Sequence, residues 1–127
     1  MDNILYVIMI VLIVWFVYKQ FAPVKGVKNL NGKEFENELK RSENNAQLID
    51  VREIHEFRQG RIVGAKNIPL GEIGQKLQQI STDKPVFLYC RSGMRSKQAG
   101  KILSRNGYSQ IYNLNGGIMA WSGKVAK

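Results

Sequence analysis

The feature that most constrains this chain is an unbroken apolar run near its start, Ile4–Tyr18. A buried core helix is one reading of the run, but a helix that is apolar on every side does not suit so small a domain, so the run is expected to lie in lipid. It gives about 22 Å of helix, and continuing it to Ile4–Ala22 brings the length closer to the roughly 30 Å of a bilayer core. Lys19 can extend to the interface. We therefore predict a transmembrane anchor over residues 1–22.

A cleaved signal peptide is the main alternative for this segment. Such a peptide has basic residues before the apolar stretch and small residues at a cleavage site, and residues 1–23 show neither pattern. The basic residues Lys19, Lys25 and Lys28 all follow the apolar run. The positive-inside rule then predicts a single-pass protein with its N-terminus outside and its main domain in the cytoplasm. The anchor could also bring two copies together as a homodimer.

Beyond the apolar run, the composition is that of a soluble domain. Residues 23–29 form a predicted linker and residues 30–127 a single domain. Short apolar runs alternate with amphipathic segments, which predicts strands and helices in turn. The expected strands are Gln47–Val51, Pro85–Tyr89 and Ile111–Leu114, with an extended segment at Gly64–Ile68, and the expected helices begin after Asn31 or cover Glu53–Gln59, Ile73–Ile80 and Ser96–Asn106. This alternation predicts an α/β fold, with a mainly parallel, doubly wound sheet and helices on both faces.

Cys90 is the chain's one cysteine, so no intramolecular disulfide can form, and a reducing compartment fits. It directly follows a predicted strand, and ligands of a parallel sheet bind at the carboxyl ends of the strands. The residues after it lead into a predicted helix, whose N-terminus favours an anion. Gly93 allows the loop to turn its N–H groups inward, while Arg91 and Arg95 add positive charge. Together these features predict a thiol with a pKa below its usual value of about 8.5.

The spacing between Cys90 and Arg95 separates two kinds of cysteine enzyme. Cysteine-dependent phosphatases place one residue more between the two positions and usually have a histidine before the cysteine. Here four residues intervene and Tyr89 precedes the cysteine. The shorter loop makes a tighter ring, which suits a single transferred sulfur atom better than a tetrahedral phosphate.

Three stretches of the chain resemble the rhodanese sulfurtransferase family. Tyr89–Ser96 is similar to the six-residue active loop of these enzymes, Leu48–Leu70 to an upstream signature, and Gly107–Trp121 to a C-terminal signature. The similarity covers about Leu30–Gly123, nearly the whole expected domain. It implies a rhodanese-like single domain with about five strands, which carries out its chemistry without a cofactor.

The resemblance also implies a reaction and a set of site residues. Cys90 would take a sulfane sulfur from a small anionic donor such as thiosulfate and hold it as a persulfide. A thiophilic acceptor, such as cyanide, a thiol or a protein, would then remove it. Arg95 is the expected clamp on the donor's sulfonate. The expected substrate-binding residues are Arg91, Ser92, Gly93, Met94, Arg95 and Ser96. Apart from the resemblance, Asp50 and Arg52 lie at the end of a predicted strand, and they and Glu56 are expected to have a supporting, structural role through hydrogen bonds or ion pairs.

Other functions remain as alternatives or are disfavoured by composition. A rhodanese-fold module could use Cys90 to bind a partner or sense oxidants without turnover, while a phosphatase- or arsenate-reductase-like enzyme is disfavoured by the loop length. The net charge of +9 comes from scattered Lys and Arg residues without a basic and aromatic platform, so nucleic acid is not an expected partner. No cluster has the spacing of metal ligands, so no metal site is expected.

Overall fold

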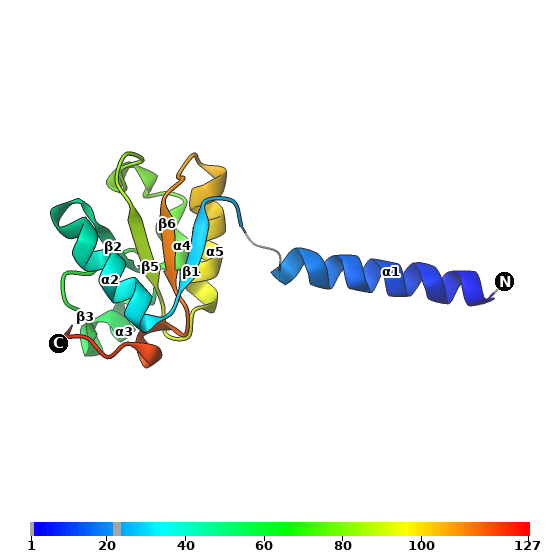
Figure 1. The fold of residues 1–127 in the computed structure, drawn as a ribbon, viewed down its shortest axis with the longest axis horizontal. Helices are drawn as coiled ribbons and strands as arrows, with labels where there is room; N and C mark the ends of the chain where they lie inside the picture. Colours follow the sequence, from blue (N-terminus) through cyan, green and yellow to red (C-terminus); the bar gives the residue numbers. More distant parts are fainter. Residues whose placement is uncertain (1, 22–23) are drawn as a thin grey trace.

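The computed structural model describes residues 2–21 and 24–127, and it contains a long N-terminal helix followed by an α/β domain (Figure 1). The helix, α1, covers Asp2–Phe21, and its apolar side chains from Ile4 to Tyr18 are exposed. Its stretch Asp2–Lys19 is long and apolar enough to cross a membrane, a property that signal sequences share. The apolar run therefore contributes nothing to the core of the domain.

A five-stranded sheet forms the centre of the domain. Its strand order is β1-β6-β5-β2-β4, and all neighbouring strands are parallel. In this order the strands are Val27–Leu30, Ile111–Leu114, Val86–Tyr89, Gln47–Asp50 and Lys66–Asn67. Every residue of β5 is buried, which explains its continuous apolar sequence in the middle of the sheet.

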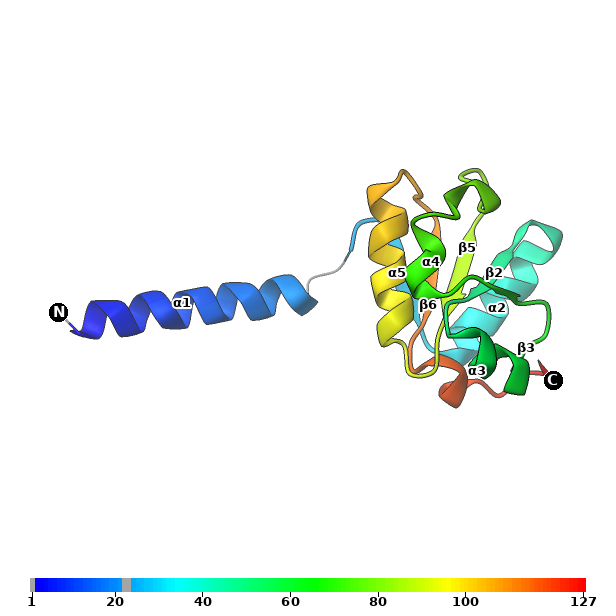
Figure 2. The ribbon, with the colours of Figure 1, turned by 180° about the vertical axis from the view of Figure 1, so that it is seen from behind.

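Helices cover both faces of this sheet, which confirms the doubly wound fold (Figures 1 and 2). On one face, α2 (Gly32–Ser42) packs Phe35 against Phe87 of β5, with ring centroids 5.4 Å apart. On the other face lie α4 (Leu70–Ile73) and α5 (Met94–Arg105). There Leu103 of α5 is part of a second hydrophobic core, between these helices and the sheet.

Short elements complete the domain around the carboxyl ends of the strands. The strands β3 (Arg61–Ile62) and β7 (Val125–Ala126) form a separate antiparallel pair beside α3 (Ile54–Gln59). Three 3-10 helices connect other parts: η1 (Glu43–Asn45), η2 (Leu77–Gln79) and η3 (Gly117–Ala120). The sequence pattern did not predict the β3–β7 pair, because two-residue strands leave no periodicity.

Two predicted boundaries differ from the structure. Residues 27–29 of the expected linker are part of β1, because Val27 packs against Gly100 of α5 and β1 pairs with β6. The expected helix Ile73–Ile80 is divided into the end of α4 and η2. Gly74, a poor helix former, lies where α4 ends. The spacing still marked the buried positions, since Ile73 and Ile80 both lie in the core.

The helix α2 starts with a capping box formed by Asn31 and Glu34. The backbone N–H of Glu34 donates to Oδ1 of Asn31 at 2.9 Å, and the N–H of Asn31 donates to Oε1 of Glu34 at 3.0 Å. This reciprocal pair satisfies two N–H groups that a helix N-terminus leaves without intrahelical partners. It fixes the point where β1 turns into α2.

Candidate active site

The cysteine loop lies between β5 and α5, at the carboxyl end of the sheet. Cys90 follows the last residue of β5 and is only 1% exposed. Gly93 has a φ of 104°, a left-handed conformation that lets the loop turn sharply toward α5. Its N–H donates to Sγ of Cys90 at 3.0 Å. The hydroxyl of Ser96, in the first turn of α5, lies 3.4 Å from the same sulfur. The loop thus surrounds the sulfur with donors.

These donors set the direction of the Cys90 pKa. Burial acts to raise the pKa, because it penalises the thiolate. The Ser96 hydroxyl and the backbone N–H groups of Ser96, Gly93 and Ser92 act in the opposite direction and outweigh burial. The pKa of Cys90 therefore lies below its ordinary value, as the sequence predicted. Hydrogen bonds to the thiolate are the main cause, rather than the two nearby arginines.

A segment far along the chain supports the back of this loop. The N–H of Ile118 in η3 donates to the carbonyl oxygen of Cys90 at 2.9 Å, and the N–H of Met119 donates to that of Arg91 at 3.3 Å. Gly117 has a φ of 65°, and a side chain on it would collide with the Arg91 carbonyl. Because η3 holds the loop's carbonyl groups, the loop's N–H groups remain free to face the sulfur.

Sequence reasoning missed this supporting role of η3. In the sequence, the glycine pair Gly116–Gly117 is part of the stretch Gly107–Trp121 that resembles the C-terminal signature. Both glycines have positive φ, and adjacent glycines near a chain end are the signal that could have revealed a close backbone approach.

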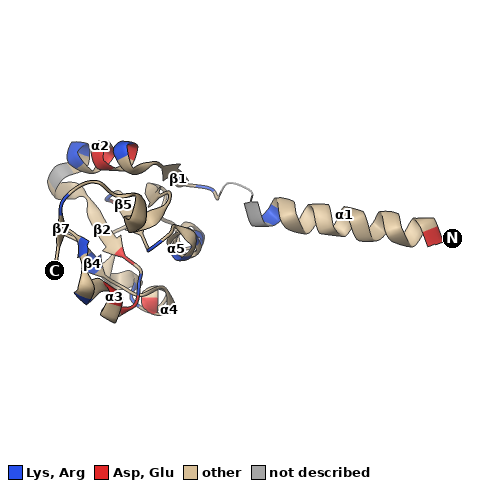
Figure 3. Ribbon diagram, turned by 90° about the horizontal axis from the view of Figure 1, so that it is seen from below, with Lys and Arg blue, Asp and Glu red and all other residues tan. Residues whose placement is uncertain are grey.

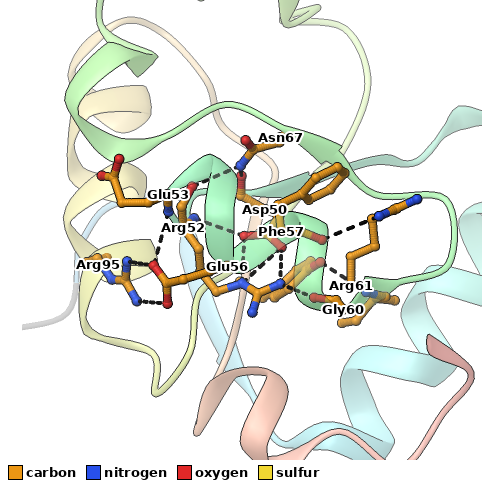
Figure 4. Close-up of polar contacts among 11 residues, drawn as sticks. Asp50, Arg52, Glu53, Glu56, Phe57, Gly60, Arg61, Asn67 and Arg95 are labelled. Atoms are coloured by element: carbon orange, nitrogen blue, oxygen red, sulfur yellow. Dashed lines mark hydrogen bonds and ion pairs between the residues drawn. The ribbon is translucent and has the colours of Figure 1, made fainter. Parts of the chain in front are cut away.

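A buried ion pair lies at the carboxyl end of β2, next to the loop (Figure 4). The guanidinium of Arg52 donates to both carboxylate oxygens of Asp50, at 2.7 to 3.0 Å, and also to the carbonyl oxygen of Gly60 at 2.5 Å. Burial and a hydrogen bond with Asp50 raise the pKa of Tyr89, the residue before the cysteine. The pair therefore joins β2, β5 and the end of α3 in one polar network.

A second ion pair connects α3 to the cysteine loop (Figure 4). Both terminal nitrogens of Arg95 donate to the carboxylate of Glu56, at 2.7 and 3.0 Å. The same carboxylate accepts the N–H of Glu53 at 3.1 Å and so caps α3. Hydrogen bonding by Arg95 is the largest cause that lowers the pKa of Glu56, to about 2. The Arg95 guanidinium, which was expected to bind the donor's sulfonate, is therefore hydrogen-bonded to a carboxylate of the protein itself.

The remaining loop residues lie at the surface or beneath it. The side chains of Arg91, Ser92 and Met94 are exposed, whereas Gly93 and Ser96 are buried. Within the described part of the chain, the guanidinium of Arg91 forms no ion pair or hydrogen bond.

A cavity of about 480 Å³ opens beside Arg91. It is lined by Arg52, Glu56, Gln59, Gly60, Arg91, Ile118, Met119, Val125 and Lys127. Residues 2–21 and 24–127 hold no group of three side chains that could bind a metal ion.

Known proteins share both the sequence pattern and the fold. The rhodanese-like domain family matches residues 31–124. The "Uncharacterized protein YqhL" of Bacillus subtilis is 45% identical over 116 residues, which cover 91% of this chain and 86% of that protein. A protein of Allochromatium vinosum named "Sulfurtransferase" is 43% identical over 75 residues, which cover 59% of this chain and 70% of that protein.

Solved structures give the same result. A rhodanese-like domain protein from Staphylococcus aureus superposes with a TM-score of 0.69 at 31% identity, covering 76% of this chain and 93% of that one. Rhodanese from E. coli, solved with anions, has a TM-score of 0.59 at 32% identity and covers 65% and 98%. Several similar proteins are named as sulfurtransferases, which supports sulfur transfer as the general activity. With residues 31–124 matched, the chain belongs to the rhodanese-like domain family.

Proposed function

We propose that this protein is a membrane-anchored thiosulfate sulfurtransferase in which Cys90 carries the sulfur. One observation carries the proposal: Sγ of Cys90 lies inside a ring of donors from Ser92, Gly93 and Ser96 that lower the thiol pKa. A thiolate is the nucleophilic form of cysteine. The same donors favour an anionic sulfur at the end of the Cys90 side chain, and the persulfide is such an anion.

The first half-reaction follows from this arrangement. The Cys90 thiolate attacks the outer sulfur of thiosulfate, a new S–S bond forms, and the bond between the two donor sulfurs breaks. Its electron pair leaves with sulfite, so Cys90 becomes an anionic persulfide and no proton is exchanged. The loop N–H groups stabilise the charge on the carried sulfur without having to reorient.

The second half-reaction returns the enzyme to its starting state. A thiophilic acceptor attacks the outer sulfur of the persulfide, and the electron pair of the broken S–S bond returns to Cys90 as a thiolate. Cyanide would leave as thiocyanate, and a thiol or a protein cysteine would leave as a persulfide. Division into two half-reactions is typical of covalent catalysis.

Donor binding is assigned to the loop as a whole, with Arg91 as the main cationic contact. Both terminal nitrogens of Arg95 already donate to the Glu56 carboxylate, at 2.7 and 3.0 Å, so the guanidinium is not free to bind the donor in the same bidentate way. Arg91 is exposed beside the cavity and has no partner among the described residues. The N–H groups of Ser92, Gly93 and Ser96 and the surface of Met94 complete the proposed binding ring.

The location proposed for the protein rests on α1. The helix is apolar on all sides and unburied over Asp2–Lys19, and basic residues follow it. We therefore propose that it anchors the protein as a single span, with the N-terminus outside and the rhodanese domain at the cytoplasmic face of the membrane. The span also offers a surface for a homodimer.

The test is to incubate the purified full chain with thiosulfate and measure its intact mass. The expected result is a gain of one sulfur atom that disappears on addition of cyanide, with thiocyanate formed over many turnovers. Cys90→Ser serves as the control and should gain nothing, because Cys90 is the only thiol. A protein that never gains sulfur, or that gains one sulfur but releases no thiocyanate, would instead support a binding or oxidant-sensing module.

A further inference from the structure

The point where the chain enters the domain lies at the end of the sheet opposite to the cysteine loop. The hydroxyl of Ser104, in the last turn of α5, donates to the carbonyl oxygen of Lys25 at 2.5 Å, and the N–H of Ile111 donates to that of Gly26 at 3.0 Å. These contacts fix the residues just before β1 beside the C-terminal end of α5. Lys25 lies four positions after Phe21, the end of α1, which is at most about 14 Å of extended chain.

The charges of the chain are distributed unevenly around this point. All ten acidic residues lie at or before Asp83, so residues 84–127 contain none. The same residues 84–127 carry eight basic side chains, namely Lys84, Arg91, Arg95, Lys97, Lys101, Arg105, Lys124 and Lys127. All charged side chains of helix α5 are therefore basic, and they are drawn in blue in Figure 3.

Three of the basic residues lie near the attachment point and define the tether patch: Lys25, Lys101 and Arg105. Lys101 and Arg105 are one turn apart on α5, and β1 packs against this helix because Val27 contacts Gly100. No member of the tether patch forms an ion pair within residues 2–21 and 24–127. Lys40, Arg41 and Lys76 elsewhere on the surface are each paired with a glutamate.

We infer that the tether patch binds the anionic headgroups of the membrane in which α1 is anchored. Two independent features of the chain support this docking. A short tether holds this end of the domain close to the bilayer surface, and the tether patch carries unpaired charge of the sign that attracts anionic lipids. The inference rests on the proposed membrane anchor.

This docking orients the active site. Helix α5 has 12 residues, about 18 Å, between Met94 beside the cysteine loop and Arg105 in the tether patch. With Arg105 at the lipid surface, the mouth of the loop faces the aqueous phase. The sulfur acceptor that this geometry fits is a water-soluble one, which approaches from the side away from the membrane.

The experiment places a fluorophore at either end of the full-length chain, in the Cys90→Ser background. Ser109→Cys puts the label beside Gly26 at the tether patch, and Ser122→Cys puts it on the exposed segment after η3. Each protein is reconstituted in nanodiscs of phosphatidylcholine alone or with about 30% phosphatidylglycerol, and quenching by headgroup nitroxide lipids is measured. We expect the Ser109 label to be quenched at least about twofold more in the anionic discs, and less so at high salt. The Ser122 label should be unaffected.

Matched variants test the role of charge. The double variant Lys101→Gln with Arg105→Gln should abolish the lipid dependence at position 109, whereas Arg58→Gln with Lys124→Gln removes the same charge elsewhere on the surface and should preserve it. Equal quenching in the two kinds of disc, or the same response in both double variants, would overturn the docking while leaving the anchor intact. A chain that fails to co-elute with nanodiscs would overturn the anchor and the docking together.

Discussion

The hydroxyl of Ser96 offers the sharpest test of how the loop activates Cys90. Ser96 is fully buried in the first turn of α5, with its Oγ 3.4 Å from Sγ of Cys90 and 3.2 Å from the carbonyl oxygen of Gly93. A hydroxyl carries one proton, so it can donate to only one of these acceptors at a time. It is expected to donate to the carbonyl when Cys90 is a thiol and to the sulfur when Cys90 is a thiolate.

The size of the effect follows from this exchange. A hydrogen bond to a charged group is worth about 1.5–3 kcal/mol, and the neutral bond that is given up is worth about 0.5–1.5 kcal/mol. The net preference for the thiolate is therefore about 1–1.5 kcal/mol, which corresponds to roughly one pKa unit. Ser96→Ala should raise the pKa of Cys90 by about that amount. The remaining N–H groups, including that of Gly93 at 3.0 Å, should keep it from rising further.

The assay is a pH titration of the thiolate's ultraviolet absorbance. Subtracting the spectrum of Cys90→Ser removes the tyrosines, because Cys90 is the only thiol. Ser92→Ala is the matched control, since its exposed side chain is replaced while the backbone N–H that faces the sulfur is kept. An unchanged midpoint in Ser96→Ala, or an equal shift in Ser92→Ala, would refute the assignment of the hydroxyl as a thiolate donor.

Three further predictions follow from the contacts around the loop. Arg91→Ala should lower kcat/KM for thiosulfate by about ten- to a hundredfold, because one charge-assisted contact with the donor is lost. The decrease should be larger than that caused by Arg95→Ala. If steady-state kinetics give the opposite order, Arg95 and not Arg91 is the main contact with the sulfonate. Glu56→Gln should cost about 1–2 kcal/mol of unfolding free energy at pH 7, reduced for the partial exposure of the pair. Because the pKa of Glu56 falls from 4.5 to about 2 on folding, that stability is present above about pH 4.5 and lost toward pH 2, where denaturation should no longer distinguish the variant from the wild type. Gly117→Ala should lower both the sulfur-transfer rate and Tm, because its side chain would displace the Arg91 carbonyl, whereas Gly74→Ala, with open space around it, should lower neither.

The central part of the fold could be predicted because its signals are local. The apolar runs that became β2, β5 and β6 are buried in the middle of the sheet, so their composition alone marks them as strands. The edge strand β1 was taken for a linker because its burial comes from β6, more than 80 residues away along the chain. Its two exposed middle residues, Lys28 and Asn29, leave no apolar run for a sequence pattern to detect.

In the candidate site too, the local features could be predicted from the sequence and the long-range contacts could not. The position of Cys90 between a strand and a helix is a local property, and it led to the loop, the donors and the direction of the pKa. The pairing of Arg95 with Glu56 joins residues 39 positions apart, and neither spacing nor composition specifies it. Because the sequence does not reveal this partner, Arg95 was expected to be free to bind the donor's sulfonate. Only the packing of α3 against the loop shows where its fork is bonded.

Helix α5 links the chemistry of the loop to the proposed position of the domain. Its first turn supplies the Ser96 hydroxyl and an N–H to Cys90, where the positive end of the helix dipole favours an anionic sulfur. Its last turn ends in Arg105, where a cation complements the negative end of the dipole. The absence of acidic residues on this helix serves both ends, because a carboxylate near the loop would repel anionic donors and one near the tether patch would repel anionic lipids. A single acidic substitution at Lys101 should therefore weaken lipid docking while leaving the Cys90 pKa unchanged, since Lys101 lies seven residues from the start of the helix, about 10 Å, near the screening length at physiological salt.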